Sequence, residues 1–318
     1  MKLDFDPKKN ITVFDNTLMP LKKVNDLLTV HNIVKNWQDV FLFRIGLKKA
    51  GFIMHLRNGR RIKIENLEDY FSFWEKGVID HLIRIEKSSK IIKFKFNGKV
   101  LKVYYDSQRQ LNNTISMIKE QFIEEQYKWL DVKNKVVIDI GANIGDSAIY
   151  FALKGAKHVY AFEPYIYSYA IATRNIELNR LQYKVTLLNE GCSGKEGSIK
   201  IDRRYKNFGG TDLKTFKNGE KIKITTLSEI IKRFNIDYPS VLKIDCEGCE
   251  YRVLLKAKNS DLRKFEQIQI EYHYGYLNLK RKLEEAGFKV SKKLPMSNLN
   301  LEAENKEMLI GLLYAKKV

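Results

Sequence analysis

The chain has 318 residues, 44% hydrophobic and 12% aromatic, enough to bury a substantial core in one large or two modest domains. Lys+Arg exceeds Asp+Glu by 57 − 38 = 19, which suits an anionic partner such as nucleic acid, a membrane surface or a phosphorylated or lipid-carried substrate, unless the lysines only solvate the surface. The start lacks the apolar core of a signal peptide, no apolar run could cross a bilayer, and three cysteines make no disulfide framework. These features predict a cytoplasmic protein in a reducing compartment.

The N-terminal part of the chain carries no recognisable chemical motif, but its sequence predicts two hairpins. Residues 52–64 turn at Asn58-Gly59, and residues 91–105 turn at Asn97-Gly98. Asn-Gly supplies the two positive-φ positions of a type I′ turn, and the flanking residues alternate in polarity as strands do. An aromatic-rich helix is expected between the hairpins, over residues 65–77.

An amphipathic helix is predicted next, over residues 113–130, because its apolar residues recur near one helical face. We therefore expect an α+β accessory domain over residues 1–112, with a role in choosing the substrate, and a second domain with the chemistry over residues 113–318. The basic residues of the two hairpins suit an anionic carrier of the substrate, or are simply solvated. They are Arg57, Arg60, Arg61, Lys63, Lys93, Lys95 and Lys99.

Strand and helix patterns alternate from residue 135 onward. Strand-like apolar runs begin near residues 135, 157, 184, 240 and 266, with helix patterns between most of them. This alternation predicts an α/β fold with a mostly parallel sheet and helices on both faces. A third pair, Asn218-Gly219, predicts a hairpin inserted into the rhythm, so the strand order around it stays open.

The first chemical signal is a glycine turn in VVIDIGANIGD, residues 136–146. Gly141 and Gly145 bracket a tight turn from a strand into a helix, where backbone N–H groups can approach a ligand. The spacing is G-x-x-x-G and not the G-x-G-x-x-G expected for a dinucleotide, and packing alone explains many such turns.

An acidic residue follows the next strand. Glu163 lies 24 residues after Asp139, at a place where a carboxylate suits the two hydroxyls of a ribose. Its alternative role is to cap a helix that begins at Pro164.

The combination of D-x-G-A-N-x-G-D with Y-A-F-E-P resembles the class I S-adenosylmethionine-dependent methyltransferases. The resemblance implies a Rossmann-like sheet and S-adenosyl-L-methionine as cofactor, with the glycine turn at its methionine portion, the acid at its ribose and the segment after the third strand near its adenine. Carried over by position, the cofactor-binding residues are Asp139, Gly141, Ala142, Asn143, Gly145, Asp146, Glu163, Pro164, Glu190 and Gly191.

The segment LKIDCEGCEYRVL, residues 242–254, resembles the K-I-D-x-E-G-x-E segment of the FkbM-type methyltransferases, and the similarity runs from about Phe122 to Phe288. That family is associated with methylation of hydroxyl oxygens, often on sugars or other secondary metabolites. The resemblance thus implies O-methylation of a hydroxyl on a carbohydrate or related metabolite. In the family pattern the positions of Cys246 and Cys249 vary and take small or apolar residues, so we expect two small buried hydrophobic residues without a metal or redox role.

The same segment places charged side chains at the end of the fourth strand. Strand alternation puts Lys243 and Asp245 on one side, with Glu247 there too if the extension continues. Methyl transfer to oxygen needs an aligned hydroxyl and a group that takes its proton, and Asp245 and Glu247 are candidates. Lys243 would hold Asp245 ionised or be structural, and Glu250 is expected to complement the dipole of the next helix.

A second candidate proton acceptor follows the fifth strand. Histidine is the usual proton acceptor near neutral pH, and His273 alternates to the same side as Glu271, although a solvent-facing loop histidine is the alternative. A divalent cation on Asp245, Glu247 and Glu271 is conceivable, but a zinc set is missing because there is one C-x-x-C and no spaced pair of histidines. We therefore expect no metal, and Asp245, Glu247, His273 and Lys243 as the catalytic residues.

Two other classes of function stay open. The charge of +19 and the segment around VYAFEP are compatible with an RNA methyltransferase that acts on ribose or base, although the acids of D-C-E-G would repel phosphates. A non-catalytic scaffold would be expected to have lost the glycine turn or the ribose acid, and both are intact. The sequence does not give the oligomeric state.

Overall fold

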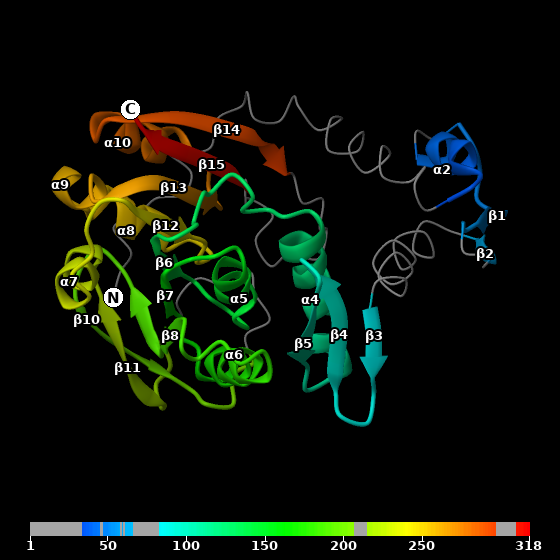
Figure 1. Cartoon of the computed structure of the whole chain (residues 1–318), viewed down its shortest axis with the longest axis horizontal. Coiled ribbons are helices and arrows are strands. Elements are labelled where there is room, and N and C mark those ends of the chain that lie inside the picture. Colours follow the sequence, from blue (N-terminus) through cyan, green and yellow to red (C-terminus); the bar gives the residue numbers. More distant parts are fainter. Residues whose placement is uncertain are drawn as a thin grey trace.

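The computed structural model describes residues 34–44, 47–57, 59, 61–65, 83–206, 215–296 and 310–318. Its centre is a seven-stranded sheet with the strand order β14-β15-β13-β12-β6-β7-β8 (Figure 1). Within this sheet β15 alone runs antiparallel to its neighbours. The strands are β6 (Val136–Ile140), β7 (His158–Phe162), β8 (Val185–Leu188), β12 (Ser240–Ile244), β13 (Phe265–Tyr272), β14 (Phe288–Met296) and β15 (Ile310–Lys317).

Helices cover both faces of the sheet, as the sequence predicts. Val137 packs in one hydrophobic cluster with α5 and α6, whereas its neighbour Ile138 packs in another with α7, α8, α9 and α10. Because both faces are buried, the strands are apolar on both sides, which explains runs such as VVIDI. The helices are α5 (Asp146–Leu153), α6 (Ile166–Leu178), α7 (Leu227–Arg233), α8 (Glu250–Lys256), α9 (Asn259–Leu262) and α10 (Leu277–Glu285).

The topology places a ligand site between β6 and β12. The chain runs outward from β6 to β8, returns to β12 on the other side of β6, and then continues outward to β13. The direction of winding therefore switches between β6 and β12. In open α/β sheets, ligands bind beyond the carboxyl ends of the strands at such a switch point.

The antiparallel strand pair of the third predicted hairpin is confirmed as an insertion beside the main sheet, but residues 202–219 connect its strands, so Asn218-Gly219 is not a two-residue turn. The strands β10 (Gly197–Ile201) and β11 (Glu220–Thr225) pair antiparallel, and β11 pairs parallel with β9 (Glu190–Cys192). The strands β14 and β15 were not predicted from the sequence.

The strand pairing of both N-terminal hairpins is confirmed, although Asn58, in the predicted turn of the first, lies outside the described residues. The first consists of β1 (Phe52–His55) and β2 (Arg61–Ile64), which share a small core with α2 (Trp37–Arg44). The second consists of β4 (Ile91–Phe96) and β5 (Lys99–Tyr104), joined by Asn97 and Gly98 with φ of +47° and +74°, and β3 (Ile83–Glu86) pairs with β4. The helix predicted over residues 65–77 lies outside the described residues from residue 66 onward.

The helix predicted over residues 113–130 begins and ends earlier. α4 (Gln108–Ile118) starts after Ser107, whose hydroxyl accepts from the Gln110 amide, and continues as a π-helix, η3 (Lys119–Ile123). Residues of the β4–β5 hairpin, α4, η3 and α5 all belong to one hydrophobic cluster. The domain boundary at residue 112 stays a prediction.

Among the described residues, no helix combines the length and the apolar character needed to cross a membrane.

Candidate active site

A pocket lies at the carboxyl ends of β6, β7 and β12, next to the switch point. It encloses about 600 Å³ of space, which includes its open mouth. The predicted site residues that line it are Gly141, Asn143, Glu163, Pro164, Glu190, Asp245 and Glu247. Ile140, Phe162, Tyr165, Cys192, Cys246 and Cys249 also line it, whereas the predicted Asp139, Ala142, Gly145, Asp146, Gly191, Lys243 and His273 do not.

The glycine turn is shaped by a close approach of the ends of β6 and β12. Gly141 has a φ of +86°, and a Cβ atom at this position would lie 1.7 Å from the carbonyl oxygen of Asp245. Only glycine fits there, for both conformational and steric reasons. The Asp245 amide donates to the Ile140 carbonyl at 3.0 Å, so the two strands stay together beyond their last paired residues. As a result, the glycine turn and Asp245 face the same pocket.

Glu163 is buried at the end of β7, beside the glycine turn. Its two carboxyl oxygens accept hydrogen bonds from the amides of Tyr165 and Asn143, each at 2.9 Å. Burial raises the pKa of Glu163 to about 8, although both amides favour the carboxylate. Near neutral pH such a group can both donate to and accept from the hydroxyls of a diol. The helix that Glu163 was predicted to cap begins at Ile166 and not at Pro164, and Glu163 bonds the amide of Tyr165, which precedes it.

Glu190 also lines the pocket and is held by an arginine. The Arg233 guanidinium donates Nη1–H and Nη2–H to its two carboxylate oxygens at 2.8 and 3.0 Å. This bidentate pair fixes the carboxylate in place.

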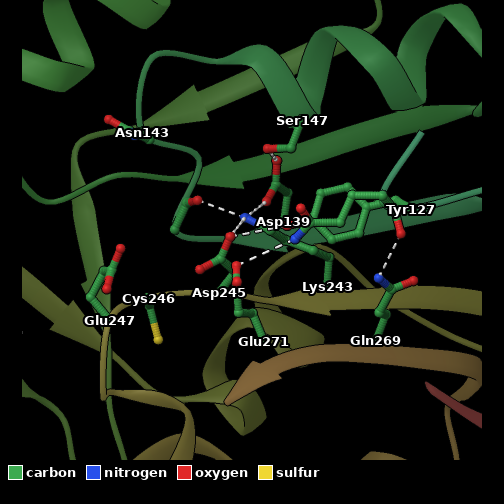
Figure 2. Close-up of polar contacts among 12 residues, drawn as sticks. Tyr127, Asp139, Asn143, Ser147, Lys243, Asp245, Cys246, Glu247, Gln269 and Glu271 are labelled. Carbon is green, nitrogen blue, oxygen red and sulfur yellow. Dashed lines mark hydrogen bonds and ion pairs between the residues drawn. The ribbon is translucent and has the colours of Figure 1, made fainter. Parts of the chain in front are cut away.

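Beneath the pocket, Lys243 forms a buried charge cluster (Figure 2). Its side chain is 2% exposed, and Nζ lies 3.0 Å from Asp139 and 3.8 Å from Asp245 while it donates to the Gly141 carbonyl at 2.7 Å. Ser147 donates to Asp139 at 2.6 Å. Burial disfavours the ammonium, but Asp139 and Asp245 hold the pKa of Lys243 above its ordinary value. Lys243 therefore stays charged and joins the glycine turn to Asp245.

A hydrogen bond from Tyr127 orients the side chain of Asp245. The buried Tyr127 hydroxyl donates to Oδ2 of Asp245 at 3.0 Å. Burial and the charge of Asp245 raise the pKa of Tyr127 well above its ordinary value, so the phenol keeps its proton. Lys243 and Tyr127 thus fix one side of the carboxylate, and the residue lines the pocket with a side chain that is 23% exposed.

His273 lies between two glutamates and not in a solvent-facing loop. Nε2 is 2.9 Å from Glu247 Oε2, and Nδ1 is 2.9 Å from Glu250 Oε1. Burial alone would lower the pKa of His273, but Glu247 and Glu250 hold it well above its ordinary value. Glu250 is fully buried and also accepts from the amides of Gly248 and His273, so it does more than complement the dipole of α8.

Two further acids lie close to this cluster. Burial and the carboxylate of Asp245 raise the pKa of Glu271 well above its ordinary value, and Gln126 donates to it at 3.3 Å. Burial raises the pKa of Asp146, at the start of α5, to about 7, although Lys243 opposes this shift.

A disulfide joins Cys246 and Cys249 at the edge of the pocket. The expectation of two free hydrophobic residues is therefore wrong for this pair. In the turn from β12 to α8, Glu247 and Gly248 adopt φ of +57° and +113°. That turn brings the two Cα atoms to 5.4 Å, within the span of about 4.4–6.8 Å that a disulfide allows. The C-x-x-C spacing was the signal for this bond, and Cys192 is free and buried.

Four site residues were missed or misjudged from the sequence: Tyr127, Ser147, Arg233 and Glu250. Tyr127 was placed on the apolar face of a helix, yet it contacts Asp245, 118 residues away. Ser147 and Arg233 carry no local pattern that distinguishes them from other polar residues. Only the contact of Ser147 with Asp139 and that of Arg233 with Glu190 reveal their roles.

Comparison with known proteins gives three findings. The family model described as the methyltransferase FkbM domain matches residues 139–290. A hexuronic acid methyltransferase of Haloferax volcanii is 29% identical over 143 residues, which cover 45% of this chain and 58% of that relative's length. Uncharacterized protein 158B of Sulfolobus islandicus rod-shaped virus 1 is 31% identical over 155 residues, or 47% of this chain and 68% of that one.

Solved structures resemble the chain more weakly. Trm5 of Methanocaldococcus jannaschii, in complex with adenosine, has a TM-score of 0.36 at 16% identity and covers 72% of this chain and 55% of its own. The ribosomal protein L11 methylase of Lactobacillus delbrueckii has a TM-score of 0.34 at 17% identity, and the match covers 68% of this chain and 82% of that one. The fold is therefore assigned from the strand order and not from these structures.

The strand order with its single antiparallel strand, together with the glycine turn after β6 and the acid after β7, defines a class I methyltransferase fold. With the matching domain over residues 139–290, the chain belongs to the FkbM methyltransferase family.

Proposed function

We propose that the protein transfers a methyl group from S-adenosyl-L-methionine to a hydroxyl oxygen of a carbohydrate. One observation carries the proposal: the same pocket is lined by the buried acid Glu163 and by the carboxylates of Asp245 and Glu247. The first suits a ribose diol, and the other two suit an acceptor hydroxyl whose proton must leave.

The residues of the pocket fit the methyl donor. Glu163 would bind the ribose hydroxyls, the Gly141–Gly145 turn would lie along the methionine portion, and the wall at Glu190 would lie near the adenine. At Gly141 no Cβ atom fits, so this position of the turn carries no side chain. When bound, the donor supplies an electrophilic methyl group on a sulfonium.

Asp245 is the group that we assign to the acceptor hydroxyl. Tyr127 and Lys243 hold Oδ2, which orients the side chain at the edge of the pocket. The carboxylate would accept the hydroxyl hydrogen bond, align the oxygen for in-line transfer and receive its proton. Both nitrogens of His273 already contact carboxylates. We therefore infer that His273 positions Glu247 and is not the proton acceptor.

The acceptor class is supported by the relative from Haloferax volcanii, which is a hexuronic acid methyltransferase. The net charge of +19 agrees with an anionic acceptor or carrier, and a uronic acid is anionic. The same charge supports the second candidate, an RNA substrate. The carboxylates of Asp245 and Glu247 at the edge of the pocket disfavour RNA, since phosphates would approach them.

The proposal is tested by methyl transfer in vitro. Purified protein is incubated with methyl-labelled S-adenosyl-L-methionine and, separately, with hexuronic-acid-containing oligosaccharides and with bulk RNA. We expect label in the saccharide as a base-stable methyl ether, with none above background in RNA. The Asp245→Asn protein serves as the matched background. Label in RNA alone would refute the carbohydrate proposal.

A further inference from the structure

Three side chains with metal-binding groups converge at the carboxyl ends of two neighbouring parallel strands. Asp245 and Glu247 follow β12, and His273 follows β13. Each offers one ligand atom, and these atoms all lie within 4.8 Å of one another. The set mixes one imidazole nitrogen with two carboxylate oxygens, a combination that first-row divalent transition metals accept.

A fourth residue, Glu250, sets the orientation of the His273 imidazole. Glu250 lies in α8, is fully buried, and contacts Nδ1 of His273 at 2.9 Å. It also accepts from the backbone amides of Gly248 and His273 at 2.9 and 3.1 Å, so its own position is fixed. Metal-binding histidines almost always donate their second ring N–H to a carboxylate, which fixes the ring and its tautomer. Glu250 performs that task here and leaves Nε2 directed at Glu247.

The carboxylates of Asp245 and Glu247 are likewise arranged so that both can bind the same metal ion. Glu247 Oε2 lies 2.9 Å from His273 Nε2, close to the distance of about 3 Å between adjacent ligands that each lie about 2.1 Å from one metal. Asp245 has Oδ2 engaged by Tyr127. Figure 2 shows Asp245 between Lys243 and Glu247. Glu271, which the sequence suggested as a third carboxylate ligand, does not belong to the converging group.

We propose that Asp245, Glu247 and His273 bind one divalent transition-metal cation, of the Mn²⁺ or Zn²⁺ class, with Glu250 as the outer carboxylate that orients His273. In the bound form the metal takes the place of the proton on Nε2. The imidazole ligand favours these ions over Ca²⁺ and Mg²⁺, which prefer oxygen ligands. Asp245 and Glu247 line the pocket, so the open side of the cation would face the acceptor, where it could bind a hydroxyl or a carboxylate oxygen.

The test measures metal binding directly and without a methyl donor, so its outcome is independent of the proposed function. Protein freed of metal with a chelator is titrated with MnCl₂, and unbound Mn²⁺ is counted by electron paramagnetic resonance; ZnCl₂ is used in parallel with a colorimetric indicator. We expect one ion per chain. Glu250→Gln should weaken binding by about 10- to 100-fold although it removes no ligand, and His273→Gln and Glu247→Gln should weaken it further.

The matched control is Glu284→Gln, an exposed glutamate on α10, which should bind as the wild type does. Glu247 is partly exposed, so Glu247→Gln tests the site even if the variants at the buried positions fail to fold; circular dichroism checks each protein. Failure of both ions to bind stoichiometrically would overturn the proposal. So would equal affinity of the wild type and Glu247→Gln, which would leave His273 as an imidazolium between two glutamates.

Discussion

Asp245→Asn is expected to lower the rate of methyl transfer by about 10³-fold, within the range of roughly 10²–10⁴ for the loss of a positioned proton acceptor. The amide keeps the size of the side chain and can still accept the hydrogen bond from Tyr127. It loses the negative charge beside Lys243 and the capacity to receive the hydroxyl proton. Single-turnover kinetics with bound donor would measure the effect on the chemical step, and calorimetry should find donor affinity nearly unchanged.

Asp237→Asn is the matched control for this prediction. Asp237 precedes the opposite end of the same strand, β12, and is 71% exposed in an ion pair with Lys264. The same chemical change there should leave the rate within about twofold of the wild type, because exposed ion pairs contribute little. An Asp245→Asn protein as active as this control would show that Asp245 is not the residue that handles the acceptor hydroxyl.

The second large effect is expected for Gly141→Ala. The new methyl carbon would meet the Asp245 carbonyl oxygen at 1.7 Å; it is fixed to Cα and the oxygen belongs to the backbone, so neither can rotate away. The ends of β6 and β12 would have to separate, which would open the pocket and displace Asp245. We expect a loss in the free energy of unfolding at least about 3 kcal/mol larger than that of a glycine without such a neighbour, together with loss of donor binding.

Gly155→Ala separates the steric effect from the conformational one. Gly155 has a similar φ of +93°, but a Cβ atom there would meet nothing closer than 3.7 Å. Gly155→Ala should therefore lower the free energy of unfolding by only roughly 1–2 kcal/mol, which is the cost of a left-handed backbone conformation for alanine. Urea unfolding followed by circular dichroism compares the two variants. Equal stability of the two would mean that the contact between Gly141 and Asp245 does not shape the site.

Much of the fold could be predicted because its signals are local. The Asn97-Gly98 turn, the apolar runs from VVIDI to EQIQIEY and the helices between them depend on neighbouring residues, and the structure confirms them. The strands β14 and β15 escaped prediction since their place depends on pairing between distant segments. β15 inserts between β13 and β14 as the antiparallel strand, and no local pattern specifies that insertion.

The residues of the candidate site that stand at the ends of strands could also be predicted from local signals. Gly141, Glu163, Asp245 and Glu247 stand at the ends of strands, where alternation and topology place ligand-facing residues, and all of them line the pocket. The contacts that orient these residues were not predictable. Tyr127 reaches Asp245 across 118 residues, Glu250 holds His273 across 23, and the disulfide depends on the positive φ angles of Glu247 and Gly248.

The central claim, that this pocket binds S-adenosyl-L-methionine through Glu163, is tested most directly by calorimetry. The wild type should bind one donor molecule per chain, and Glu163→Gln should bind about 10- to 100-fold more weakly, because an NH₂ group would replace one of the two oxygens that accept from the Asn143 and Tyr165 amides. Glu177→Gln, at an exposed position on α6, should bind as the wild type does. No detectable binding to the folded wild type, or equal binding by Glu163→Gln, would contradict the account.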